Sequence, residues 1–302
     1  MSQRSLGIES KYSASERFVQ ATSRNKNLIS DDEQQQLKKT VVCFFGLSVG
    51  SHAAVTWIME SRADHIKIAD PDTIEPSNLN RLRYGWDSIG KMKTAVISDQ
   101  IHGMHPDTVI HSLTKTDPQS VRQFILQTPR PDIIVDETDD ITAKFYFRTV
   151  AKKLRIPLIC ATDVGDNVLV DIERYDYPIQ PKPFLGRIDT GIFKRIRTLT
   201  PKERMKCVIE LVGLEYNSEA MLDSLLSIGK TIPTWPQLGA TATIAGGVIA
   251  TVIKKIVLKE QIPSGRYVIS LDDIFSGDFH SAVREKKRLN KIKKIRQIFL
   301  TR

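Results

Sequence analysis

A turn of small residues and an acidic residue one strand further along could bind the phosphates and ribose of a nucleotide. The apolar run 40–45 ends at GLSVGS over residues 46–51, and a second run ends at Asp70. Backbone N–H groups at such a turn can meet a phosphate, and the carboxylate can accept hydrogen bonds from a ribose. The turn is not a clean G-x-G-x-x-G, because Ser48 and Ser51 replace two glycines. Taken alone, it fits a nucleotide site and a tight strand-to-helix connection equally well.

Further blocks of sequence follow in a fixed order. They read SRN at 23–25, DPDTIEPSNLNR at 70–81, GKMK at 90–93, DETD at 136–139 and WPQL at 235–238. The pattern D-x-D-x-x-x-x-S-N-L-N-R, G-x-x-K and D-x-x-D resembles the signature of the ThiF/MoeB family, the adenylating relatives of ubiquitin-activating enzymes. WPQL and GLSVGS are similar to one branch of that family. The matched blocks span residues 23 to about 271.

The resemblance implies a reaction and a nucleotide. A carboxylate would attack the α-phosphorus of ATP, giving an acyl-adenylate and pyrophosphate, and fixed cations and Mg²⁺ would meet the charge on the leaving phosphates. By their match to the motifs, Arg81 and Lys93 would be those cations and Asn78 a hydrogen-bonding partner beside them. Asp139 would be the Mg²⁺ ligand, with the alternative that it belongs to a helix N-cap cluster with Asp140.

The same resemblance assigns the remaining nucleotide contacts. Asp70 would be the ribose acceptor, and Gly46 and Ser48 would allow the close approach of the backbone. Arg24 matches an arginine that the family lends across a homodimer interface to the ATP of the neighbouring subunit. Asp72, in contrast, is interpreted as a structural residue that supports its loop.

The three cysteines limit which disulfide, zinc or thiol sites the chain can form. Cys43, Cys160 and Cys207 lie far apart without a C-x-x-C pair, which argues against a disulfide framework and against a zinc site. We therefore expect no zinc, although many relatives hold a zinc ion with two C-x-x-C pairs. We also expect the protein to lie in a reducing cytoplasm. Cys43 and Cys160 fall in buried strands. Cys207 is the remaining candidate nucleophile for a thioester, on a helix without a neighbouring histidine.

The elements that would position these residues alternate between strand and helix. Short apolar runs predict strands at 40–45, 65–70, 108–113, 132–136 and 157–161, with an antiparallel extension at 168–175. Intervening segments predict helices at 52–62, 91–104, 120–127 and 141–154. This alternation indicates a doubly wound, Rossmann-like, mostly parallel α/β sheet that binds ligands at the carboxyl ends of its strands.

The chain divides into four parts. We expect an N-terminal helical arm (1–38), an ATP-binding adenylation domain (39–176), a crossover loop with the C-terminal part of that domain (177–283), and a basic amphipathic tail (284–302). The apolar run 238–253 is shorter than a membrane span needs and predicts a buried helix. The polar N-terminus has no apolar secretion signal.

Charge is concentrated in the tail. The 302 residues carry a formal charge of +9, but residues 284–302 hold nine Lys or Arg and only Glu285 as an acid. The rest of the chain is close to neutral, which argues against a nucleic-acid binder. Leu289, Ile292, Ile295 and Phe299 recur at helical spacing, so the tail predicts an amphipathic helix. It would either pack on the body or gather an acidic peptide substrate.

Three functions are consistent with these features. The first is adenylation of carboxylates on a peptide, as in ribosomal peptide natural-product and antibiotic biosynthesis, so that an internal amide or amine condenses with them. The second is activation of the C-terminus of a ubiquitin-like or sulfur-carrier protein. The third is a non-catalytic nucleotide-binding module, against which the joint presence of Arg81, Lys93 and Asp139 argues.

Overall fold

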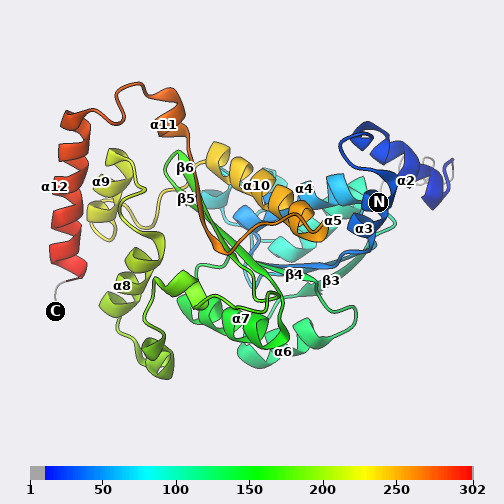
Figure 1. Cartoon of the computed structure of the whole chain (residues 1–302), viewed down its shortest axis with the longest axis horizontal. Coiled ribbons are helices and arrows are strands. Elements are labelled where there is room, and N and C mark those ends of the chain that lie inside the picture. The colour runs from blue at the N-terminus through cyan, green and yellow to red at the C-terminus, as the bar shows by residue number, and fades with distance from the viewer. Residues whose placement is uncertain (1–10, 301–302) are drawn as a thin grey trace.

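A seven-stranded sheet forms the centre of the computed structural model, which describes residues 11–300 (Figure 1). Its strand order is β3-β2-β1-β4-β5-β6-β7. The strands are β1 (Val42–Phe45), β2 (His65–Ala69), β3 (Val109–Leu113), β4 (Ile133–Asp136), β5 (Leu158–Val164), β6 (Asn167–Glu173) and β7 (Gly265–Ser270). β1 to β5 are parallel, and β6 and β7 pair antiparallel. The doubly wound, mostly parallel sheet with an antiparallel extension is thereby confirmed, and β7 is a strand that the sequence pattern does not predict.

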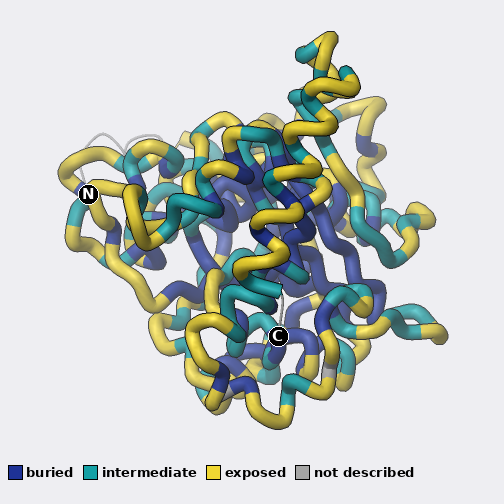
Figure 2. Tube along the Cα trace, turned by 90° about the vertical axis from the view of Figure 1, so that its left-hand side faces the viewer, coloured by how far each residue is buried: buried dark blue, intermediate teal, exposed yellow. Residues whose placement is uncertain are grey.

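Helices cover both faces of the sheet, because successive strand residues point to opposite sides. The first face is covered by α3 (Asp31–Lys39), α4 (Val49–Ser61), α5 (Lys93–Met104) and α10 (Gly239–Val257), and the second by α6 (Pro118–Leu126) and α7 (Ile141–Leu154). Phe44 belongs to the core under the first group, whereas its neighbours Cys43 and Phe45 belong to the core under the second. Figure 2 shows the inner strands as buried and the outer helices as partly exposed.

α10 corresponds to the apolar run 238–253 and continues through Lys254 and Lys255. It is the one helix of residues 11–300 that is long and apolar enough to cross a membrane. In the structure Ala242, Ala245 and Ile249 on α10 pack into the main core against α4, so this helix belongs to the interior of the domain.

The segment after β6, for which the sequence indicates only a crossing loop with helices, is largely helical. It contains η4 (Pro183–Gly186), η5 (Thr190–Thr198), α8 (Pro201–Val212) and α9 (Glu219–Ser227), followed beyond β7 by α11 (Leu271–Phe275) and α12 (Ala282–Phe299). α8, α9 and α12 form one end of the molecule (Figure 1). Ile292 and Ile295 are buried there, but Leu289 is 58% exposed. The prediction that Leu289 belongs to the apolar stripe of this helix is therefore wrong.

The expected N-terminal arm contains α2 (Ala14–Thr22), η1 (Ser23–Asn25) and α3. Its first ten residues, and residues 301–302 of the tail, lie outside the described part of the chain.

The sheet register aligns the loops that carry the predicted motifs. Phe45 at the end of β1 pairs with Ala69 of β2 and with Asp136 of β4. Gly46, Asp70 and Glu137 therefore begin three adjacent loops at one edge of the sheet. Gly46 has φ +85°, and a Cβ atom on it would lie 2.4 Å from the carbonyl oxygen of Glu137. Only glycine fits this contact without displacing the loop after β4.

Gly46→Ala should lower the free energy of unfolding by about 2–4 kcal/mol, because it adds a left-handed alanine and a clash with backbone. Urea denaturation measures this change. Gly247→Ala is the matched control, since Gly247 lies within α10 and nothing is within 4 Å of its added Cβ. The control should be neutral or stabilising by about 0.5–1 kcal/mol. Equal stability of the two variants would contradict the close contact at Gly46.

Candidate functional site

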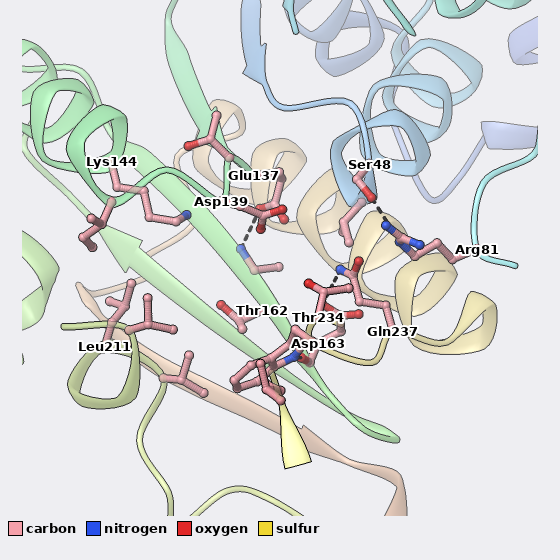
Figure 3. Close-up of a pocket in the computed structure, with 18 of the residues that line it drawn as sticks. Ser48, Arg81, Glu137, Asp139, Lys144, Thr162, Asp163, Leu211, Thr234 and Gln237 are labelled. Atoms are coloured by element: carbon pink, nitrogen blue, oxygen red, sulfur yellow. Dashed lines mark hydrogen bonds between the residues drawn. The ribbon is translucent and has the colours of Figure 1, made fainter. Parts of the chain in front are cut away.

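A cavity of about 350 Å³ lies where the strand order reverses, beside the carboxyl ends of β1 and β4. Open α/β sheets bind ligands at this position. Ser48 follows β1, Arg81 follows β2 and Asp139 follows β4, and all three line the cavity (Figure 3). Three separate blocks of the sequence thus contribute to one site. The opposite part of the cavity is apolar.

Arg81 is held at the cavity by contacts along its whole length. Its Nε donates to Ser48 Oγ at 3.3 Å, and its Nη1 donates to the carbonyl oxygen of Ser77 at 2.9 Å. Its own carbonyl oxygen lies 2.6 Å from Nε2 of His52, a buried residue of α4. Burial lowers the pKa of His52, which favours the neutral ring, and the hydrogen bond to the Arg81 carbonyl opposes this effect. The guanidinium is therefore fixed next to the turn after β1, where it could meet an anion.

Asp70 and Lys93 form a buried pair beside the turn that follows β1. The Asp70 carboxylate accepts hydrogen bonds from the N–H groups of Leu47 at 2.6 Å and Asp72 at 2.8 Å. Lys93 Nζ lies 3.7 Å from Asp70 Oδ1 and 2.9 Å from Asp72 Oδ2. Burial raises the pKa of Asp70, and Lys93 and the two N–H groups oppose this effect. Asp72 thus supports its loop, and neither Asp70 nor Lys93 is among the residues that line the cavity.

Asp139 and Asp140 have different surroundings. Asp140 is the N-cap of α7, and its side chain accepts a hydrogen bond from the N–H of Thr142 at 2.9 Å. Asp139 is exposed and lines the cavity. The helix N-cap proposed as an alternative for Asp139 is thus supplied by its neighbour. The carboxylate of Asp139 faces the space that Arg81 also borders.

The other predicted residues lie around this site. Asn78 ends η2 (Pro76–Asn78) and is buried, and its Oδ1 accepts a hydrogen bond from the N–H of Glu75 at 3.1 Å. Arg24 is exposed in η1 and does not line the cavity of its own chain. Cys207 is buried in α8, and burial raises its pKa, so a reactive thiolate is disfavoured.

A part of the site that the sequence analysis missed lies at the end of β5. Asp163 is 5% exposed and lines the cavity. Gln237 Nε2 donates to Asp163 Oδ1 at 3.2 Å, and Trp235 Nε1 donates to the Asp163 carbonyl oxygen at 3.3 Å. Asn80 Nδ2 also donates to the Gln237 carbonyl oxygen at 2.8 Å. The WPQL block therefore connects β5 to the loop that carries Arg81, and no group of residues 11–300 donates to Asp163 Oδ2.

Lys144 is a second cation that the sequence analysis missed. It lines the cavity from α7, and its Nζ lies 3.4 Å from Asp136 Oδ2. Arg148 Nη1 contacts the same carboxylate at 2.6 Å, and Arg148 Nε lies 2.7 Å from Glu173. Burial alone would raise the pKa of Asp136, but the two cations outweigh it and lower the pKa. Asp136 of the D-x-x-D block is therefore a structural partner of buried cations and not a free ligand.

Asp139 is the exposed carboxylate of the cavity lining, whereas Asp163 in the same lining is buried. No three His, Cys, Asp or Glu side chains of the described residues come together as a metal-binding group. Mg²⁺ in nucleotide sites commonly takes one or two carboxylates, with phosphate oxygens and water as its other ligands. One exposed carboxylate at the cavity fits that mode of binding.

Comparisons with known proteins identify the family of the chain. A model of the ThiF family matches residues 22–291. Uncharacterized protein MT1398 of Mycobacterium tuberculosis (strain CDC 1551 / Oshkosh) is 31% identical over 247 residues, which are 80% of this chain and 33% of that protein. The chain therefore spans only about a third of that relative's length.

Two further comparisons concern proteins with a named activity or ligand. The sulfur carrier protein ThiS adenylyltransferase of Escherichia coli (strain K12) is 24% identical over 139 residues, covering 45% of this chain and 54% of that protein. The crystal structure of E. coli MccB with AMPCPP and MccA superposes with a TM-score of 0.56 and 19% identity. The superposition covers 80% of this chain and 63% of the MccB chain, and at this sequence identity it shows a similarity of fold alone.

Asp163→Asn should change the pH dependence of stability. Burial raises the pKa of Asp163 in the folded chain, so its contribution to stability is full below the unfolded pKa near 3.8 and declines as the pH rises through the folded value. Asparagine removes this decline. We expect the variant to gain stability relative to the parent between pH 4 and pH 7, measured by urea unfolding at both values.

Asp166→Asn makes the same change at an exposed carboxylate in the adjoining turn and is the matched control. A change of equal size in this control would mean that general charge effects, and not the burial of Asp163, are responsible.

Proposed function

The chain belongs to the ThiF family, and on that premise we propose that it is an ATP-dependent adenylyltransferase that activates a carboxylate of a peptide. The observation that carries this proposal is the convergence of Ser48, Arg81 and Asp139 on a cavity whose other end is apolar. One end offers a cation and a carboxylate for a nucleotide with its metal. The other end offers space for an acyl group.

The residues of the cavity suit the electrostatics of adenylation. When a substrate carboxylate attacks the α-phosphorus of ATP, negative charge grows on the leaving pyrophosphate. Arg81 would stabilise this charge, and the backbone after Gly46 at the start of α4 would approach the phosphates. Lys93 would contribute by exchanging its contact with the exposed Asp72 for a phosphate, and Asp70 would take the ribose. Asp139 would hold Mg²⁺, which neutralises phosphate charge when bound.

A peptide is the proposed substrate for two reasons. First, the buried Cys207 disfavours a route through a thioester on this chain, whereas condensation with an internal amide or amine needs no cysteine. Second, MccB, which shares this fold, has been crystallised with MccA and a nucleotide analogue. Activation of a small carrier protein is the alternative, in keeping with the named activity of the sulfur-carrier relative.

We also propose that the protein acts as a homodimer in a reducing cytoplasm. Arg24 is exposed and is not among the residues that line the cavity of its own chain, which supports a contact with the ATP of a neighbouring subunit. The three cysteines are free, as a reducing compartment would keep them.

Asp139→Ser should reduce ATP–pyrophosphate exchange at least about 100-fold, because it removes the carboxylate for Mg²⁺ beside the phosphates. Exchange is measured with Mg²⁺, labelled pyrophosphate and a panel of synthetic peptides with free C-termini. Asp140→Ser is the matched control, because serine can still cap α7. Normal exchange by Asp139→Ser, or equal loss in both variants, would show that the site is wrongly assigned.

Mixing two inactive variants tests the donation of Arg24. If each site takes Arg24 from the partner, a mixed dimer of Arg24→Ala and Asp139→Ser contains one intact site. Random mixing should then restore about a quarter of the parent exchange rate. Lys26→Ala, a change at an exposed cation two residues away, should remain active by itself. An active Arg24→Ala protein, or a mixture without recovery, would contradict donation across the interface.

A further inference from the structure

The apolar end of the cavity is built mainly by one side of α8. Met205, Val208 and Leu211 recur every three residues along this helix and line the cavity together. Ile141 from α7 and Trp235 from the WPQL block extend this wall. We call these five residues the apolar lobe.

The lobe is continuous with the proposed nucleotide end. In Figure 3, Asp163 and Thr162 lie between Leu211 on one side and Arg81 on the other. A group attached to the α-phosphate near Arg81 would therefore extend over β5 toward α8. Lys144 borders the same space, but its ammonium group is paired with the carboxylate of Asp136. The side chains that α8 itself contributes to the lining are all apolar, which favours an uncharged group beside this helix.

Packing behind the lobe fixes its shape. Met205 and Trp235 contact a buried cluster that includes Leu222 and Leu225 of α9 and Ile295 of α12. Ile141 and Leu211 belong to another buried cluster with Phe145 and Phe184. A lobe supported from two sides is formed before a ligand arrives, so burial of an apolar group in it costs little rearrangement.

We propose that the apolar lobe binds the side chain of the residue whose carboxylate is adenylated, and that this side chain is aliphatic. The inference rests on the proposed adenylation and adds the class of its substrate: a peptide whose activated residue resembles leucine rather than glycine or an acidic residue. Burial of a four-carbon side chain in such a lobe strengthens binding about tenfold or more.

Stable analogues of the acyl-adenylate test this specificity without knowledge of the natural peptide. The probes are the leucyl, glycyl and glutamyl 5′-sulfamoyl adenosines, with AMP as reference, and affinities are measured by calorimetry with the full chain. The leucyl probe should bind at least about tenfold more tightly than each of the other two. Equal affinities, or tightest binding of the glutamyl probe, would overturn the inference but leave adenylation standing. Affinities no better than that of AMP for all three probes would instead contradict adenylation itself.

A pair of variants locates the effect in the lobe. Val208→Trp fills the space beside α8 and should reduce the ratio of leucyl to glycyl affinity to about one, while AMP still binds. Val283→Trp, the same substitution at a residue of α12 that is 65% exposed, should keep the parent ratio. If Val208→Trp retains the full preference for leucine, the side chain binds elsewhere and the inference fails.

Discussion

The carboxylate of Asp70 holds together the three segments that form the proposed nucleotide end of the cavity. It is 3% exposed, accepts the N–H of Leu47 after β1 and of Asp72 after β2, and lies beside Lys93 at the start of α5. A buried carboxylate is tolerable only when such partners compensate its lost hydration. Because one side chain bridges these segments, the turn, the loop of Arg81 and the helix of Lys93 are positioned relative to one another before any ligand binds.

Much of this arrangement could be predicted from the sequence, because it depends on local patterns. Apolar runs define the parallel strands, and the motifs begin where those runs end, so the loops that carry Ser48, Arg81 and Asp139 start at the same end of the sheet. The partners of Lys93 were harder to predict. Its pairing with Asp72 depends on a loop geometry that no periodicity reveals.

The apolar end of the cavity could not be predicted in the same way, because its contacts join distant segments. Gln237 and Asp163 are 74 positions apart, and their hydrogen bond requires the loop before α10 to pass the end of β5. The lobe residues of α8 look like any buried helix face until the packing of α9 and α12 is known. The basic tail proved to be part of this support: Ile292 and Ile295 are buried against α9, and Lys291 pairs with Asp223 at 2.6 Å.

The central claim is that ATP and the acyl group share one cavity between β1, β4 and α8. A crystal structure of the protein with AMPCPP and Mg²⁺ tests it most directly. The account predicts phosphate oxygens within hydrogen-bonding distance of Arg81 and a metal ion bound to Asp139, with the apolar lobe still open beside the α-phosphate. A nucleotide bound elsewhere, with Arg81 still donating to Ser48 and Ser77, would contradict it.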